Sequence, residues 1–226
     1  MKYNNIHEGV FNIRPNRFIA NVTIYGKEET CHVKNTGRCK ELLLPGTKVF
    51  LEKSGNEERK TKYDLVAVMK NGNCINIDST APNKAVHEWL QGGGLFGKAD
   101  FIKPESTYKN SRFDFYIEAK GRQIFAEVKG VTLENDTVAM FPDAPTERGV
   151  KHLKELIECK KEGFDAYIIF VLQMKGVKYF TPNVKTDPNF AKTLKECSEN
   201  GVNVVCVECV VTPDSMVIDE NVKVVL

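Results

Sequence analysis

The stretch SRFDFYIEAKGRQIFAEVKG, residues 111–130, decides the fold of this chain. Its pattern predicts two strands that fold back on each other at Lys120-Gly121, because a two-residue turn ending in glycine is typical of a β-hairpin. With those two residues at the centre of the turn, Ala119 pairs with Arg122, and each further pair follows outward.

Side chains alternate between the two faces of a strand, so this register divides the hairpin into an apolar face and a mixed face. The apolar face is expected to form core and carries Phe113, Phe115, Ile117, Ile124, Ala126 and Val128. The mixed face is expected to be accessible and carries Arg112, Asp114, Tyr116, Glu118, Gln123, Phe125, Glu127 and Lys129.

Two carboxylates oppose each other on the mixed face. The register sets Asp114 directly opposite Glu127, and like charges in that arrangement destabilise a strand pair. A divalent cation between them removes the repulsion, and carboxylate oxygens suit Mg²⁺ or Mn²⁺. Lys129 points to the same face, where its ammonium group can contact a metal-bound water or a phosphate oxygen. The alternative is a solvated strand face with mixed charges.

An acidic residue, a hairpin and a Glu-x-Lys motif together resemble the core of the PD-(D/E)xK nuclease superfamily. The resemblance implies that Asp114 and Glu127 hold Mg²⁺ or Mn²⁺, and that the backbone carbonyl of Val128 completes the metal shell. It implies that Lys129 orients the attacking water or stabilises the developing charge. The proline of the superfamily motif is missing, because Phe113 precedes the aspartate.

Many nucleases of this superfamily add an acidic ligand from a helix before the hairpin. Glu88 lies in such a segment, AVHEWL, and is therefore a candidate metal ligand; the alternative is a solvated helix residue.

Two further segments resemble signatures of the sugar fermentation stimulation protein A family: CHVKNTGRCKELLLPG, residues 31–46, and FPDAPTERGVKHLKEL, residues 141–156. The resemblance covers almost the whole chain. It implies an N-terminal domain that resembles the oligonucleotide-binding (OB) fold, followed by a nuclease-like domain. Family members are described as DNA-binding proteins with a suggested regulatory link to sugar use.

The pattern of strands and helices fits an α/β protein of two domains. Residues 1–80 read as short strands separated by turns, which indicates a small OB-like β-barrel with one short helix at GRCKELLL, residues 37–44. Pro82 begins a helix, so the boundary is placed near residue 80. Residues 81–226 then run as a three-stranded meander, helix, strand, helix and buried strand, which predicts a PD-(D/E)xK-like sheet flanked by helices.

Charge and composition narrow the function classes. Over 226 residues the net charge is only +2, but residues 1–80 hold 13 Lys and Arg against 9 Asp and Glu, a balance that favours a polyanionic partner. The longest apolar run, residues 166–172, has strand length, and the N-terminus lacks a signal peptide, so we expect a cytoplasmic protein without a membrane partner. Cys206 and Cys209 lie in a β-branched run, where a zinc or redox role is not expected.

Two groups of residues are candidates for binding DNA, which we expect to occur without sequence preference. On the predicted helix after residue 146, Arg148 and His152 share a face with Lys151 beside them, and such a face binds phosphate; the alternative is a solvated amphipathic helix. In the N-terminal domain, cations interleave with aromatic residues, as in OB folds that hold single strands. These candidates are Arg14, Arg17, Phe18, Lys34, Arg38 and Lys40, although for any one aromatic residue a place in the core is the simpler expectation.

The function favoured by these patterns is a DNA-binding protein with a Mg²⁺-dependent nuclease domain and a possible link to the regulation of sugar metabolism. The alternative is a DNA-binding transcriptional regulator that retains a nuclease fold without catalysis. A carbohydrate-binding module is a third possibility, but no residue pattern supports it.

Overall fold

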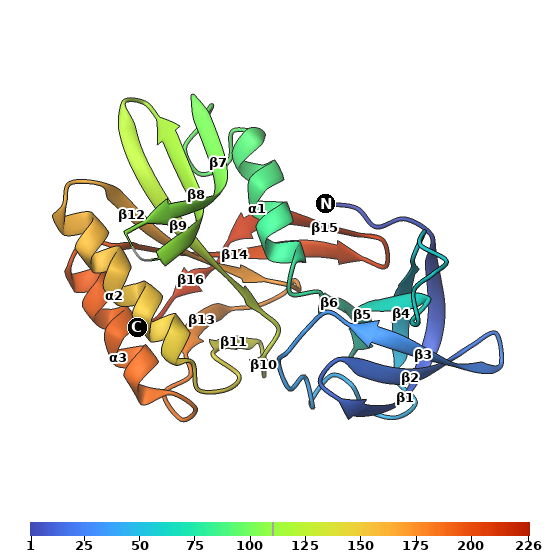
Figure 1. Ribbon diagram of the computed structural model, residues 1–226. Helices are drawn as coiled ribbons and strands as arrows, with labels where there is room; N and C mark the ends of the chain where they lie inside the picture. The colour runs from blue at the N-terminus through green and yellow to red at the C-terminus, as the bar shows by residue number, and fades with distance from the viewer. Residues whose placement is uncertain (110) are drawn as a thin grey trace.

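The computed structural model describes residues 1–109 and 111–226 of the chain. In the N-terminal part, five strands close into a barrel, in which parallel pairing of the third with the fifth strand completes the ring (Figure 1). The strands are β1 (Ile6–Asn16), β2 (Ile19–Ile24), β3 (Lys27–Val33), β4 (Lys48–Lys53) and β5 (Tyr63–Lys70), and β6 (Asn73–Asn76) extends the sheet beyond β5. The predicted OB-like barrel is therefore confirmed.

The segment between β3 and β4 departs from its prediction. Residues 37–44 were expected to form a short helix, but they form only a tight turn in which the Leu42 and Leu43 amides donate to the Cys39 carbonyl. Cys39 has a φ of 46°, which lies in the left-handed region and interrupts a right-handed helix. Pro45 follows directly, so no helix can continue beyond it.

The second domain is a twisted six-stranded sheet with helices on both faces. Its strand order is β15-β14-β12-β9-β8-β7, and β9, β12 and β14 run parallel to one another. The strands are β7 (Phe101–Tyr108), β8 (Ser111–Ala119), β9 (Arg122–Val131), β12 (Asp165–Leu172), β14 (Asn203–Thr212) and β15 (Ser215–Asn221). The predicted strands and helices of this domain are confirmed, but β15 and the short strands at residues 134–135, 138–141 and 223–224 were not predicted.

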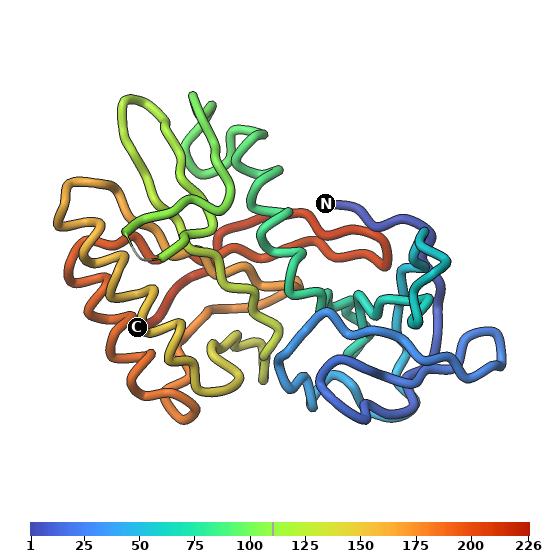
Figure 2. Tube along the Cα trace, in the orientation of Figure 1, coloured from blue at the N-terminus to red at the C-terminus, as the bar shows by residue number. Residues whose placement is uncertain are grey.

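Helices cover the sheet from opposite sides, as the tube in Figure 2 also shows. One face packs on α1 (Ala81–Gln91), and the other packs on α2 (Glu147–Lys161) and α3 (Pro188–Glu199). A small sheet of β10 (Glu134–Asn135), β11 (Val138–Phe141), β13 (Tyr179–Pro182) and β16 (Lys223–Val224) lies beside the main one. β12 is buried almost throughout because both layers cover it, as its apolar sequence indicates.

The hairpin of β8 and β9 has the predicted register from the Ala119–Arg122 pair out to the Phe115–Ala126 pair. The predicted apolar face is buried against α1, with one exception. Phe113 belongs to the opposite layer, where its ring lies 5.6 Å from that of Phe125. The regular alternation of side chains between the two faces of β8 therefore ends at Phe115, the residue of β8 farthest from the turn that is paired with β9.

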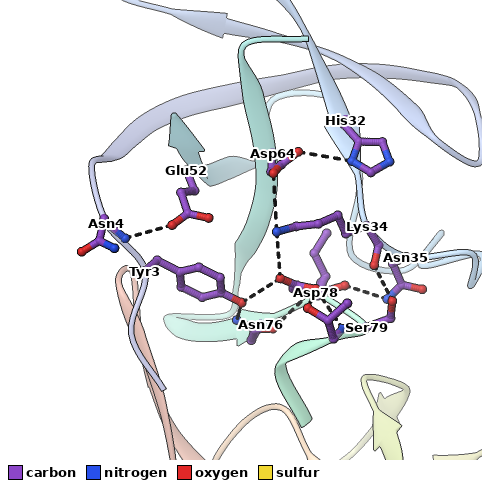
Figure 3. A network of polar contacts seen from close by, with 12 residues as sticks. Tyr3, Asn4, His32, Lys34, Asn35, Glu52, Asp64, Asn76, Asp78 and Ser79 are labelled. Carbon is purple, nitrogen blue, oxygen red and sulfur yellow. Dashed lines mark hydrogen bonds and ion pairs between the residues drawn. The ribbon is translucent and has the colours of Figure 1, made fainter. Parts of the chain in front are cut away.

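A network of buried polar groups joins the barrel to the second domain, and Figure 3 shows the part of it that lies within the first 79 residues. At its centre, the fully buried carboxylate of Asp78 forms an ion pair with Lys34 at 3.2 Å and accepts a hydrogen bond from the Tyr3 hydroxyl at 3.3 Å. From β12, the Gln173 amide donates to the side chain and carbonyl of Asn76 and to the Asp78 carbonyl. Since charged and polar groups are buried only when they are paired, these contacts fix the two domains in one arrangement.

The first residues do not belong to the barrel, although the predicted first domain began at residue 1. The Met1 ammonium group donates to the Met216 carbonyl at 2.8 Å, and Lys2 forms a bridge with Ser215. The N-terminus therefore lies against β15 of the second domain.

The structure also shows where Cys206 and Cys209 lie and how long and apolar the helices are. Cys206 and Cys209 are buried in different core clusters, on opposite sides of β14, so they cannot bind one metal ion together. Among the described helices, none is both long and apolar enough to cross a membrane.

Replacing Gln173 by alanine is expected to lower the free energy of unfolding by about 1–3 kcal/mol, because three buried acceptors lose their donor. Gln91, exposed at the end of α1, provides the matched control, and Gln91→Ala should change stability by less than about 0.5 kcal/mol. Urea unfolding measures both, and equal midpoints for the two variants would contradict the role given to Gln173.

Candidate metal site and nucleic-acid surface

The predicted direct pairing of Asp114 with Glu127 on one face is wrong, because the hairpin ladder ends at the Phe115–Ala126 pair. Asp114 instead points toward α1, whereas Glu127 faces α2. The Asp114 Oδ2 accepts a hydrogen bond from the backbone amide of Val128 at 2.8 Å, across the hairpin. Its Oδ1 accepts from the side-chain amide of Asn83 on α1 at 2.7 Å. The carboxylate is thus held between the hairpin and the helix by two donors.

Glu127 is almost fully buried, with 2% of its surface exposed, and lies on the side of β9 that faces α2. Its Oε1 accepts from the Lys129 ammonium group at 2.5 Å and from the Nδ1 of His152, which α2 supplies. The other oxygen, Oε2, is buried and has no hydrogen-bond partner among residues 1–109 and 111–226. A buried carboxylate oxygen without a donor is costly unless a cation or another ligand satisfies it.

The two carboxylates influence each other electrostatically. Burial raises the pKa of Asp114, and the negative charge of Glu127 raises it further, whereas the bonds from Val128 and Asn83 oppose the shift. For Glu127, burial alone raises the pKa, but the hydrogen bond from His152 and the charge of Lys129 outweigh it, so the pKa lies below its ordinary value. One acid of the pair therefore ionises readily, and the other ionises against both burial and repulsion.

This donor set fits a hard divalent cation that keeps much of its water. Within the described residues, no group of three or more His, Cys, Asp and Glu side chains is arranged to hold a metal ion, so the site has two carboxylates rather than a full protein cage. Mg²⁺ commonly binds through one or two carboxylates, with waters and substrate phosphate completing its shell. The partnerless Oε2 of Glu127 and the repulsion felt by Asp114 are both relieved by such a cation.

Glu88 does not join this pair. Its carboxylate forms an ion pair with the Met1 ammonium group at 2.6 Å, and its side chain is mostly exposed. On the same helix, Asn83 is the residue that reaches Asp114. The two positions lie five residues apart, which turns them about 140° away from each other around the helix. The sequence analysis did not identify Asn83. The angle between the two positions indicates that α1 can direct either Asn83 or Glu88 toward the hairpin, but not both, and it does not indicate which one.

On α2 the predicted cationic face divides into two parts. His152 is buried and serves Glu127, so it is not free to contact DNA phosphate as expected. The Nε of Arg148 donates to the Nε2 of His152 at 3.5 Å, which assigns the imidazole proton to Nδ1, facing the carboxylate. Arg148 and Lys151 are exposed, so phosphate binding by these two residues stays a prediction. Thr146 caps the helix, as expected, by accepting from the Gly149 amide.

In the barrel, two predicted DNA-binding cations are engaged in the fold. Arg14 donates to four backbone carbonyls, at 2.6–2.9 Å, those of Arg17, Asn35, Gly37 and Arg38. Lys34 lies between Asp78 and Asp64; burial alone lowers its pKa, but the two carboxylates outweigh burial and raise it. Arg14 therefore shapes the β3–β4 loop, and Lys34 neutralises buried acids.

The remaining predicted barrel residues form an exposed surface. Arg17 and Phe18 lie in the β1–β2 turn, where Phe18 is 51% exposed, and Arg38 and Lys40 project from the β3–β4 loop. Arg17, Arg38 and Lys40 share the wall of one shallow pocket of about 230 Å³. We call Arg17, Phe18, Arg38 and Lys40 the basic surface.

Comparison with known proteins places this fold in a family. A model described as the sugar fermentation stimulation protein RE domain matches residues 80–215, and one described as the SfsA N-terminal OB domain matches residues 13–77. The chain belongs to the sugar fermentation stimulation protein family. A homologue from Clostridium beijerinckii is 61% identical over the whole of both chains, and one from Ruminiclostridium cellulolyticum is 56% identical over 99% of each.

A solved structure resembles this family member over its full length. It is described as Pyrococcus furiosus SfsA in complex with Ca²⁺, has a TM-score of 0.91 and 30% sequence identity, and the match covers 100% of this chain and 98% of that one. In the present member of the family, the two signature segments meet: the Arg38 amide donates to the Asp143 carboxylate at 3.0 Å. The barrel loop is thereby fixed against the segment that leads into α2.

Asp114→Asn is expected to stabilise the protein in cation-free buffer, by an amount that depends on pH. Below the ordinary carboxyl pKa of 3.8, both folded and unfolded wild-type chains carry a protonated Asp114, so the variant gains little. As pH rises, the unfolded wild-type chain ionises first because its pKa is lower, and wild-type stability falls until the folded carboxyl ionises as well. Urea unfolding at several pH values between 4 and 7 measures the difference; a gain independent of pH would contradict the raised pKa.

Proposed function

We propose that this member of the family is a divalent-cation-dependent nuclease that hydrolyses phosphodiester bonds in DNA. One observation carries the proposal: the buried carboxylate of Glu127 raises the pKa of the half-buried Asp114 and contacts Lys129, and its Oε2 has no partner among the described residues. A protein that only needed a stable sheet would gain by replacing these groups with apolar ones.

In the proposed reaction, Asp114, Glu127 and the carbonyl of Val128 hold Mg²⁺ or Mn²⁺. When bound, the cation polarises the scissile phosphate and lowers the pKa of a water molecule. His152 positions the Glu127 carboxylate, and Glu127 in turn places the Lys129 ammonium group beside it. The Lys129 ammonium group is placed to donate a hydrogen bond to the attacking water, or to a phosphate oxygen on which negative charge develops.

The Pyrococcus furiosus relative supports a role for a divalent cation in the proposed function. That relative was solved in complex with Ca²⁺. Ca²⁺ and Mg²⁺ are both hard cations that take oxygen ligands, although Ca²⁺ accepts more of them at longer distances.

The basic surface is proposed to hold the DNA strand. Arg17, Arg38 and Lys40 offer charge to phosphates, and the exposed ring of Phe18 offers a platform for an unpaired base. OB folds bind single strands through this combination, which carries little sequence preference. Arg148 and Lys151 extend the cationic groups to the α2 side of the metal site.

A DNA-binding regulator without catalysis is the second candidate. It is favoured by the contacts of Glu127, whose Oε1 is already engaged by Lys129 and His152 without a cation. In that case these residues only stabilise the sheet, and the link of the family to sugar use would operate through DNA binding.

Asp114→Asn and Glu127→Gln are each expected to abolish Mg²⁺- or Mn²⁺-dependent cleavage of single-stranded DNA, because each removes a charged ligand while conserving shape. DNA affinity should change by less than about threefold, since the phosphate contacts lie elsewhere. Glu118→Gln, on the same hairpin but away from the pair, is the matched control and should cleave normally. Lys129→Ala should lower the cleavage rate more than cation affinity.

Cleavage is followed on labelled oligonucleotides, and cation binding by calorimetry. If the wild-type protein neither cleaves any nucleic acid with Mg²⁺ or Mn²⁺ nor binds these ions, the catalytic proposal fails and the regulator becomes the better account.

DNA affinity is expected to fall steeply between roughly 50 and 200 mM salt, because phosphate contacts release counterions. The double reversal Arg17→Glu with Arg38→Glu should weaken binding to all sequences alike and reduce the slope of log affinity against log salt by about 1–2. Lys27→Glu, at the exposed first residue of β3, is the control and should have little effect. Loss confined to one sequence would show base recognition instead.

A further inference from the structure

A pocket of about 180 Å³ lies where the β3–β4 loop of the barrel meets the end of β9. That volume is well above the roughly 10–15 Å³ that admits one water molecule. Its wall includes Asn35, Thr36 and Gly37 from the loop, Gly130 from β9, Asp143 from the segment before α2, and Gln173 from the end of β12. Neither the metal site nor the basic surface, as described above, accounts for this pocket.

The pocket occupies a position where α/β folds commonly bind ligands. β9 and β12 run parallel and end side by side at Val131 and Leu172, and open sheets of this type bind ligands at the carboxyl ends of their strands. Two glycines keep the space open. A Cβ on Gly130 would lie 2.5 Å from Gln173 Oε1, and a Cβ on Gly37 would lie 2.8 Å from the Asp143 carboxylate.

The wall is fixed by the network that joins the domains. Asn35 donates to the Ile77 carbonyl at 2.8 Å and accepts from the Gly37 amide at 2.7 Å, while Ser79 donates to the Lys34 carbonyl at 2.5 Å (Figure 3). These bonds fix the loop to the segment that follows β6, and the bond from the Arg38 amide to Asp143 fixes it to the second domain, so the pocket is preformed.

The chemistry of the wall selects a neutral ring with hydrogen-bond donors. It has amides, hydroxyls, the edge of Phe141 and the carboxylate of Asp143, but no lysine or arginine among its described residues, so it is not a phosphate site. Asp143 accepts from the Arg38 amide through Oδ2, and no described group donates to its Oδ1. Carboxylates accept from the exocyclic amino groups of bases, and unpaired bases are recognised through such edges.

The pocket also lies between the two parts of the proposed nuclease. Thr36 and Gly37 line both this pocket and the shallow pocket of the basic surface. At its other end, Gly130 directly follows Lys129, and the strand advances only about 3.3 Å per residue. A DNA strand that runs from the basic surface to Lys129 therefore passes over the opening.

We propose that this pocket receives one unstacked base of the DNA strand, next to the phosphate at Lys129. The inference rests on the proposed function and extends it, because it gives the protein a contact with a base as well as with the backbone. It also implies that the substrate is single-stranded or unpaired at that position, since a base within a duplex cannot enter.

The test compares two five-nucleotide DNA strands, one with normal bases and one whose residues are all abasic, in buffer that contains a chelator instead of Mg²⁺. Thr36→Trp fills the pocket, and should weaken binding of the normal strand by at least about fivefold more than binding of the abasic strand. Asp143→Asn retains the acceptor for the Arg38 amide and should also weaken only the normal strand. Thr30→Trp, on the exposed side of β3, is the matched control and should change neither affinity.

Fluorescence anisotropy gives the affinities, and cleavage of the normal strand with Mg²⁺ is measured separately with wild-type protein. If wild-type protein binds and cleaves the strand but Thr36→Trp weakens both strands equally, or neither, the pocket inference is overturned and the nuclease proposal stands. If wild-type protein binds neither strand, both proposals fall. Release of the normal strand by millimolar glucose would overturn the inference in favour of a sugar site.

Discussion

The buried charge of Glu127 is the constraint on which the second domain depends. A carboxylate placed in the interior is tolerated only when its partners are fixed, and here they come from two elements: Lys129 on the same strand and His152 on α2. The contact therefore fixes α2 against β9 as well as the carboxylate itself. Because Oε1 takes both donors, Oε2 remains buried and unpaired among the described residues, and this is where we propose that a cation binds.

A second buried network fixes the position of the barrel relative to the sheet that carries Glu127. Asp78, Lys34 and Gln173 join the barrel to the end of β12, and the N-terminal residues reinforce the junction from the other side. The β3–β4 loop is consequently fixed beside the carboxyl ends of the parallel strands. In the proposed function the barrel supplies the surface for a nucleic-acid strand and the sheet supplies the cation site, and only their fixed arrangement forms the pocket between them.

Local patterns in the sequence were enough where neighbouring residues decide the structure. The turn at Lys120-Gly121 sets the hairpin register, and the cap at Thr146 starts α2, because both depend on a few adjacent residues. The prediction for residues 37–44 was wrong because a leucine-rich run has helix propensity, whereas the left-handed Cys39 and the bonds from Arg14 impose a loop. Propensity is a weak guide where long-range contacts act on a short segment.

The sequence by itself determined the family, the α/β class with its OB-like barrel, and the presence of Asp114, Glu127 and Lys129 on one hairpin. The hairpin follows from turn chemistry and side-chain alternation, which act within a few residues, whereas the family follows from the resemblance of residues 31–46 and 141–156 to its signatures. Only the tertiary structure decided which polar groups are free: it directs Glu88 to the N-terminus, Arg14 to backbone carbonyls and His152 to Glu127. A charged side chain takes its role from the partners that packing brings to it, and those partners lie up to 100 or more positions away in the chain, as between Arg38 and Asp143.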